Sequence, residues 1–156
     1  MRRTQLLGLH FLLVLPCFCE AAITITKMND INLGLLKAGP AGRQWIVGTD
    51  GSLTGTGQAD YVSGAAAGEI VVTDTSAPAM VQIQALNITS YNGFQVNQIL
   101  CRYGNGSQTR CDLSGYSITT NNMSISLKVG IDVESTQYHY GGDNAGVDFD
   151  ISITYQ

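Results

Sequence analysis

The sequence has 156 residues, of which 44% are hydrophobic and 13% are charged; this length fits one domain, and this composition excludes a disordered chain. The 8 basic residues stand against 12 acidic ones, and the resulting net charge of −4 disfavours nucleic-acid binding. Beyond residue 20, no apolar run approaches the roughly 18–20 residues that a membrane helix needs.

The first 21 residues have the pattern of a secretory signal peptide. A basic start with Arg2 and Arg3 precedes an apolar run from Leu6 to Pro16, which is too short to span a bilayer. Small residues follow the run, and we place cleavage after Ala21. The predicted mature domain is then 22–156. We expect it to be secreted to the periplasm, outer surface or fimbrium of a Gram-negative bacterium, with a membrane needed only for export.

Alternation of apolar and polar side chains with period two predicts short strands along the first two thirds of the chain. Turn residues such as Asp50-Gly51 and Asn92-Gly93 separate these strands, and no segment shows the period and caps of a helix. The glycine- and alanine-rich stretch 55–68 is expected to form a loop or a weak edge strand. The predicted strands are 23–26, 31–35, 43–47, 69–73, 79–86 and 94–100.

Cys101 and Cys111 are the two cysteines that remain after Cys17 and Cys19 leave with the signal peptide. An even pair in an exported protein favours one disulfide bond. The segment between them is polar and contains two glycines, which is typical of a hairpin tip. A zinc site is disfavoured because the mature chain has only one histidine, His139. No cofactor is predicted.

The clearest alternation lies in the last quarter of the chain. Residues 123–133 place their apolar side chains on one face and Ser, Lys, Gly and Asp on the other. The last strand repeats this pattern, and we predict an all-β fold, an antiparallel immunoglobulin-like β-sandwich that is either complete or lacks one strand. The apolar face of that last strand consists of Val147, Phe149, Ile151, Ile153 and Tyr155.

No pattern of catalytic residues is present, so we predict that the protein is not an enzyme. His139 lies between two tyrosines ahead of a double-glycine turn, and the sequence has no nucleophile elbow of the G-x-S-x-G type. We therefore expect His139 to be a surface residue. A secreted hydrolase that uses His139 is the weakest alternative.

The C-terminal part is acidic, since the chain after Lys128 contains no further Lys or Arg. A solvated acidic face is the favoured interpretation, because alternating carboxylates on a strand need not converge on one point. A calcium site, which needs several converging oxygens, is the alternative. The acidic residues are Asp132, Glu134, Asp143, Asp148 and Asp150.

Four short motifs carry a resemblance to a known family. They are the alternation at 23–26, the I-N-L-G step at 31–34, the V-x-x-D-G turn at 47–51 and the closing segment 146–156, which ends in Tyr-Gln. In these features the chain resembles a secreted bacterial family that is catalogued mainly as a domain of unknown function. That family has a pilin-like β-sandwich similar to spore coat protein U and to chaperone–usher fimbrial subunits.

The resemblance implies a structural or adhesive subunit that is assembled by β-strand addition. In such subunits a periplasmic chaperone fills a groove left by a missing strand, and the N-terminal segment of another pilin-like subunit later replaces it. Here the last strand, Val147–Tyr155, would bind the partner. Ile23 and Ile25 would anchor a donor strand, or belong to an ordinary edge strand of their own domain, since Lys27 interrupts the apolar stripe.

The alternative function is a self-complete periplasmic or extracellular sandwich that binds a ligand such as a carbohydrate. Aromatic rings suit half-wet binding surfaces, although most aromatic residues of this chain are expected to serve the core. The candidates are Trp45, Tyr61, Tyr91, Tyr103, Tyr116, Tyr138 and Tyr140.

Overall fold

A computed structural model describes residues 24–73, 79–113, 116–120, 124–141 and 146–155. The predicted signal peptide, 1–21, and Ile23 lie outside the described residues. Within them, no helix is long and apolar enough to cross a membrane.

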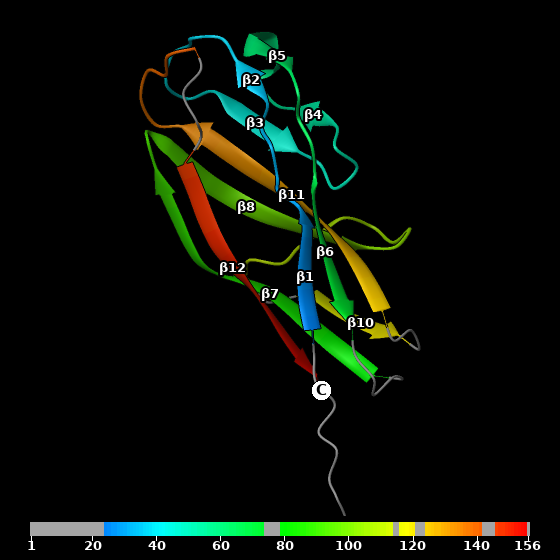
Figure 1. Cartoon of the computed structure of the whole chain (residues 1–156). Coiled ribbons are helices and arrows are strands. Elements are labelled where there is room, and N and C mark those ends of the chain that lie inside the picture. The colour runs from blue at the N-terminus through cyan, green and yellow to red at the C-terminus, as the bar shows by residue number, and fades with distance from the viewer. Residues whose placement is uncertain (1–23, 74–78, 114–115, 121–123, 142–145, 156) are drawn as a thin grey trace, which may run out of the picture.

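The described residues form twelve strands and one short 3₁₀ helix, η1, so the predicted all-β class is confirmed (Figure 1). The elements are β1 (Thr24–Asn29), β2 (Leu35–Leu36), β3 (Gln44–Val47), β4 (Leu53–Thr54), η1 (Gln58–Asp60), β5 (Tyr61–Ser63), β6 (Gly68–Thr73), β7 (Ala79–Tyr91), β8 (Phe94–Tyr103), β9 (Thr109–Arg110), β10 (Tyr116–Thr120), β11 (Ser124–Ser135) and β12 (Gly146–Tyr155).

β11 is the central strand of the larger sheet. One of its edges pairs with β8, and its other edge pairs first with β6 and then with β3. β1 extends the sheet beyond β6, β4 extends it beyond β3, and β9 extends it beyond β8. The alternation predicted for 123–133 is confirmed from Ser124 onward, because the core-facing side chains are buried. These are Ile125, Leu127, Val129, Ile131 and Val133.

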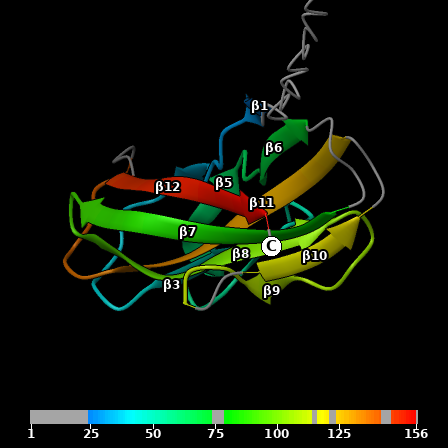
Figure 2. The ribbon, with the colours of Figure 1, turned by 90° about the horizontal axis from the view of Figure 1, so that it is seen from below.

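A smaller sheet consists of β7 between β10 and β12, with every pairing antiparallel. β12 lies beside β7 in both views of the molecule (Figure 1, Figure 2). Apolar side chains from both sheets form one core, with Val81 and Ile83 of β7 buried together with those of β11. The predicted antiparallel β-sandwich is therefore confirmed.

Asp132 shows that the prediction of a fully solvated acidic face is wrong. Its side chain, on the outward face of β11, is only 2% exposed. Gln44 Nε2 donates hydrogen bonds to both carboxylate oxygens, at 2.9 and 3.0 Å. The amides of Asn97 and Gln98 donate at 3.3 and 3.4 Å. Burial of this carboxylate is tolerated because amide donors from neighbouring strands take the place of water.

His139 is buried, so the prediction that it is a surface residue is wrong. It is 2% exposed, and its ring centroid lies 5.1 Å from that of Trp45 and 6.0 Å from that of Phe94. Its backbone exchanges two hydrogen bonds of 3.0 Å with Gly39. The two flanking tyrosines are exposed, and alternation then directs the residue between them into the core.

The stretch 55–68 contains η1 and β5, and β5 pairs with β2 as a short two-stranded ribbon. The expected weak strand is therefore present. Gly57 packs directly on the indole of Trp45, where a β-carbon would overlap the ring. Its carbonyl oxygen accepts a hydrogen bond of 2.8 Å from Trp45 Nε1. Close packing on the only tryptophan explains why this position is a glycine.

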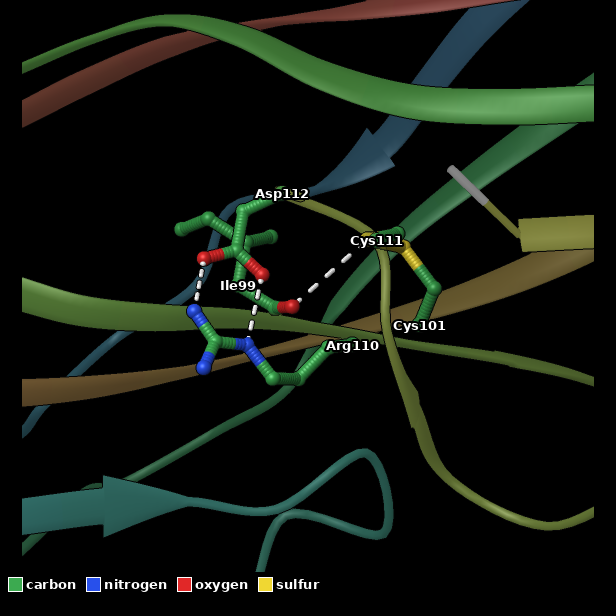
Figure 3. The surroundings of a disulfide bond; sticks show 5 residues. All are labelled: Ile99, Cys101, Arg110, Cys111 and Asp112. Atoms are coloured by element: carbon green, nitrogen blue, oxygen red, sulfur yellow. Dashed lines mark hydrogen bonds and ion pairs between the residues drawn. A yellow bond between two sulfur atoms is a disulfide. The ribbon is translucent and has the colours of Figure 1, made fainter. Parts of the chain in front are cut away.

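The disulfide between Cys101 and Cys111 lies where the chain leaves the larger sheet (Figure 3). Cys101 is in β8 opposite Thr109 of β9, so the predicted hairpin and its disulfide are confirmed. The backbone of Cys111 joins the two sheets: its N–H donates to Ile99 in β8 at 3.0 Å, and its carbonyl accepts from Ala85 in β7 at 2.8 Å. The bond therefore fixes the crossing point between the layers.

Candidate binding groove between two sheet edges

An apolar groove of about 400 Å³ lies between β12 of the smaller sheet and β1 of the larger sheet. Figure 1 shows β12 (red) and β1 (blue) on the same side of the molecule, with β8 and β11 passing behind the space between them. The groove is lined by Ile25, Lys27, Asn29, Asp30, Ile31, Leu33, Gly68, Glu69, Ile70, Val129, Ile131, Val133, Val147, Asp148, Phe149, Asp150 and Ile151.

The floor of the groove is part of the hydrophobic core. Val129, Ile131 and Val133 belong to β11, and each is at most 5% exposed. Ile70 of β6 continues the floor and is partly buried. A ligand that enters the groove therefore meets aliphatic side chains on a rigid central strand.

One wall of the groove is β12, the predicted partner-binding strand. Val147, Phe149 and Ile151 line the groove and are only partly buried. Ile153 packs against the core beyond the groove lining, and Tyr155 is placed only through its backbone pairing with Val81. Among the described strands β12 pairs only with β7, so its second edge has no strand beside it.

The opposite wall begins with β1, all six residues of which are exposed. β1 pairs with β6, and no other described strand pairs with it. Ile25 lines the groove with 49% of its surface exposed, so in this structure it belongs to an edge strand of its own domain. Lys27, in the same register, forms an ion pair of 2.6 Å with Asp30. Ile31 and Leu33 continue this wall and are partly buried.

Two carboxylates lie on the outward face of β12, where each accepts a hydrogen bond from a residue of β7. Asp148 and Asp150 are exposed, alternate with the apolar side chains of β12, and also line the groove. Asp148 accepts a hydrogen bond of 3.3 Å from the Tyr91 hydroxyl, and Asp150 accepts one of 2.7 Å from Asn87 Nδ2. The charge of Asp148 raises the pKa of the Tyr91 phenol above its ordinary value of 10.0, with further contributions from burial and the hydrogen bond.

A third carboxylate that lines the groove, that of Glu69, already has a cationic partner. Lys128 Nζ lies 2.7 Å from it, and the Ser126 hydroxyl donates another bond of 2.7 Å. These bonds from Lys128 and Ser126 lower the pKa of Glu69 below its ordinary value of 4.5. The negative charge of Glu69 therefore has a partner within the fold.

No group of three or more potential metal-ligating side chains of His, Cys, Asp or Glu occurs in the part of the chain that the structure describes. Asp143, a candidate for the alternative calcium site, lies outside that part. His139 has no hydrogen-bond partner at either ring nitrogen among the described residues.

Of the aromatic residues considered for carbohydrate binding, Tyr138 and Tyr140 form an exposed pair, and the others do not join it in the described part of the chain. Trp45 is fully buried, which excludes it from stacking on a ligand. Tyr138 and Tyr140 are 55% and 69% exposed and form an edge-on pair with ring centroids 5.3 Å apart. Tyr91 is also exposed, at 48%. The other three, Tyr61, Tyr103 and Tyr116, pack against the core.

Comparison with family models, curated proteins and solved structures gives no match to this chain. The resemblance to pilin-like proteins therefore stays a prediction that is carried by its short motifs alone.

Sequence analysis named the strand of one wall, β12, and Ile25 of the opposite wall, but it did not predict that a groove lies between them. Alternation in 31–35 hinted at Ile31 and Leu33, although only the end of that stretch forms a strand. Nothing in the sequence of β11 indicated that part of its apolar face forms the floor of a groove. That property depends on the gap between β1 and β12, which are far apart in the chain.

Proposed function

We propose that the protein is a non-catalytic, exported structural or adhesive subunit that joins its partners by β-strand addition. The observation that carries this proposal is the apolar groove flanked by edges of β1 and β12 with which no described strand pairs. An added strand would satisfy the backbone groups of an open edge and cover aliphatic side chains that now face solvent.

The energetic basis of the proposal is burial of apolar surface. Phe149 and Ile151 are large and only partly buried, and Ile25 is half exposed. Full burial of one such side chain contributes about 1.5–3 kcal/mol, so a strand that places several apolar groups in the groove gains enough to offset its ordering entropy. A periplasmic chaperone and other pilin-like subunits are the partners that the family resemblance implies.

The proposal can be tested without knowing the partner. A strand of alternating Val and Ser, tethered to the C-terminus of the full chain by a flexible Gly/Ser linker, should enter the groove of its own molecule. We expect the free energy of unfolding to rise by about 2–4 kcal/mol. We also expect hydrogen exchange of the β12 amides to slow. The control carries the same tether with every Val replaced by Ser.

Two matched variants locate the effect. Ile151→Asp places a charge inside the groove, whereas Ser152→Asp places the same charge on the outward face of the same strand. The gain in stability should disappear in the first variant and persist in the second. A tethered strand that changes neither stability nor exchange of β12 would refute strand addition at this groove.

Carbohydrate binding is a second candidate function, favoured by the exposed pair of Tyr138 and Tyr140. The residue between them, His139, is buried against Trp45, so the backbone that carries both tyrosines is attached to the core. Replacement of both tyrosines by Ala should abolish binding on a glycan array, while Tyr91→Ala should leave it unchanged. Absence of glycan binding by the unmodified protein would eliminate this candidate.

A further inference from the structure

The residues around the groove indicate which charge a strand that fills it should carry. β12 presents two rows of side chains, with the partly buried Val147, Phe149 and Ile151 on the core side and the exposed Asp148 and Asp150 on the outward side, and residues of both rows line the groove. A strand added to the free edge of β12 must alternate in the same way, because successive side chains of a strand point to opposite faces. Its outward side chains then lie next to the two aspartates.

Neighbouring side chains on one face of a sheet interact strongly enough to select a partner. Directly opposite residues on paired strands have β-carbons about 4.5–5.5 Å apart, where opposite charges attract and like charges repel. Asp148 and Asp150 therefore favour Lys or Arg, and disfavour Asp or Glu, at the outward positions of the added strand.

The charges of these two aspartates are not balanced within the described part of the chain. Lys27 pairs with Asp30, and Lys128 pairs with Glu69, so the nearby cations already have partners. Neither Asp148 nor Asp150 is among the residues joined by the ion pairs of the described chain. Of the charged residues that line the groove, one is basic and four are acidic.

We propose that the groove binds an extended segment of another protein in which apolar side chains alternate with basic ones. The apolar side chains occupy the groove, and the basic side chains lie beside Asp148 and Asp150. This inference rests on the proposed function, strand addition, and adds to it the chemical class of the partner.

The N-terminal strand of a second copy of this chain does not fit this description. If Ile25 of that copy entered the groove, Lys27 would follow it inward, because the two residues lie two positions apart. The outward side chains would then be Thr24, Thr26 and Met28, which carry no charge. A lysine would be directed into an aliphatic groove, and the aspartates would remain without a cation.

Peptides of about nine residues, which span about 30 Å as strands, test the proposal against the full chain expressed with its leader. The first alternates Val with Lys, the second alternates Val with Glu, and the third has the sequence of residues 22–30 of this chain. A fourth has the composition of the first in scrambled order. Fluorescence anisotropy of labelled peptides measures binding.

We expect the Val/Lys peptide to bind at least about tenfold more tightly than each of the others. Its advantage over the Val/Glu peptide should shrink as the salt concentration is raised from about 0.05 M to about 0.5 M, since exposed charges are screened. In the variant Asp148→Asn/Asp150→Asn, in which both amide oxygens can still accept hydrogen bonds, the Val/Lys and Val/Glu peptides should bind equally. The matched control, Asp50→Asn/Glu134→Gln, removes two acidic charges away from the groove and should keep the preference.

The outcomes separate the two proposals. Equal binding of the Val/Lys and Val/Glu peptides would overturn the basic partner and leave strand addition standing. Binding of the 22–30 peptide as tightly as the Val/Lys peptide would overturn the choice of another protein over a second copy. Equal binding of the scrambled peptide would show only unspecific charge attraction and would also overturn the inference. Failure of every peptide to bind, together with a tethered strand that has no effect, would overturn strand addition itself.

Discussion

β11 and β12 have the same alternating sequence pattern but opposite positions in the fold. β11 has strands on both edges, and its outward carboxylate, Asp132, is enclosed by amides. Among the strands that the structure describes, β12 has one neighbour, and its outward carboxylates, Asp148 and Asp150, face solvent. The comparison shows that alternation defines the two faces of a strand, whereas the number of neighbouring strands decides whether those faces are closed.

The largest expected difference between the two strands is the loss of stability when an isoleucine of each is replaced by alanine. Ile125 of β11 is 3% exposed, whereas Ile151 of β12 is partly buried beside the groove. We expect Ile125→Ala to lower the free energy of unfolding by about 2–5 kcal/mol, because it leaves a cavity in a closed core. Ile151→Ala should cost about 1 kcal/mol, since solvent already reaches this site. Urea denaturation of both variants measures the difference, and equal losses would contradict the assignment of β12 as an open edge.

Removal of the disulfide tests how much this bond at the crossing point between the sheets contributes to stability. Cys101 and Cys111 are both fully buried, and the loop that they close spans a sequence separation of 10 residues. Replacing both by Ala should lower the free energy of unfolding by about 2–3 kcal/mol, because the unfolded chain gains freedom. Thermal unfolding of the oxidised protein and of the variant checks this expectation. An unchanged melting temperature would show that the bond adds nothing to the backbone link between Cys111 and Ala85.

A matched pair of substitutions compares the outward faces of the two strands directly. Asp132→Asn would direct an amide N–H₂ toward amide donors that need an acceptor, and we expect a loss of about 1–3 kcal/mol. Asp148→Asn on β12 should change stability by less than about 0.5 kcal/mol, since its side chain is exposed. Urea titrations at neutral pH distinguish the two. A similar effect at both positions would mean that the enclosure of Asp132 has no energetic consequence.

Local patterns predicted the elements that depend on short stretches of chain. Alternation predicted the strands around Leu127 and Phe149, and an even pair of cysteines in a chain expected to be exported predicted the disulfide. The burial of His139 was not predictable in this way, because it depends on contacts with Trp45 and Phe94 from distant strands.

The groove was beyond sequence analysis for the same reason. Its apolar floor has the same sequence pattern as any strand of a closed core, and only the three-dimensional arrangement shows that this floor borders a groove between β1 and β12. Likewise, the enclosure of Asp132 requires Gln44, Asn97 and Gln98 to converge from two other strands. Pairing between strands that are distant in the chain determines these features, and period-two alternation does not predict which strands pair.

The smallest expected effect is a pH dependence of the free energy of unfolding that arises at the crossing point between the sheets, where Asp112 follows the disulfide (Figure 3). Partial burial would raise the pKa of Asp112. However, hydrogen bonds from Arg110, at 2.7 and 3.1 Å, and from backbone groups lower it below its ordinary value of 3.8. A carboxylate with a depressed pKa in the folded state stabilises the fold above its unfolded pKa and loses that contribution as pH falls through the folded value.

Stability should therefore decline on acidification below about pH 4, and Asp112→Asn should make this decline shallower. Urea denaturation between pH 2 and pH 6 provides the measurement, with Asp30→Asn, an exposed acid in a surface ion pair, as the control that leaves the slope nearly unchanged. If Asp112→Asn and Asp30→Asn flattened the acid limb equally, the Arg110–Asp112 pair would be no more than another surface ion pair, and the crossing point would be held by the disulfide and the backbone bonds of Cys111 alone.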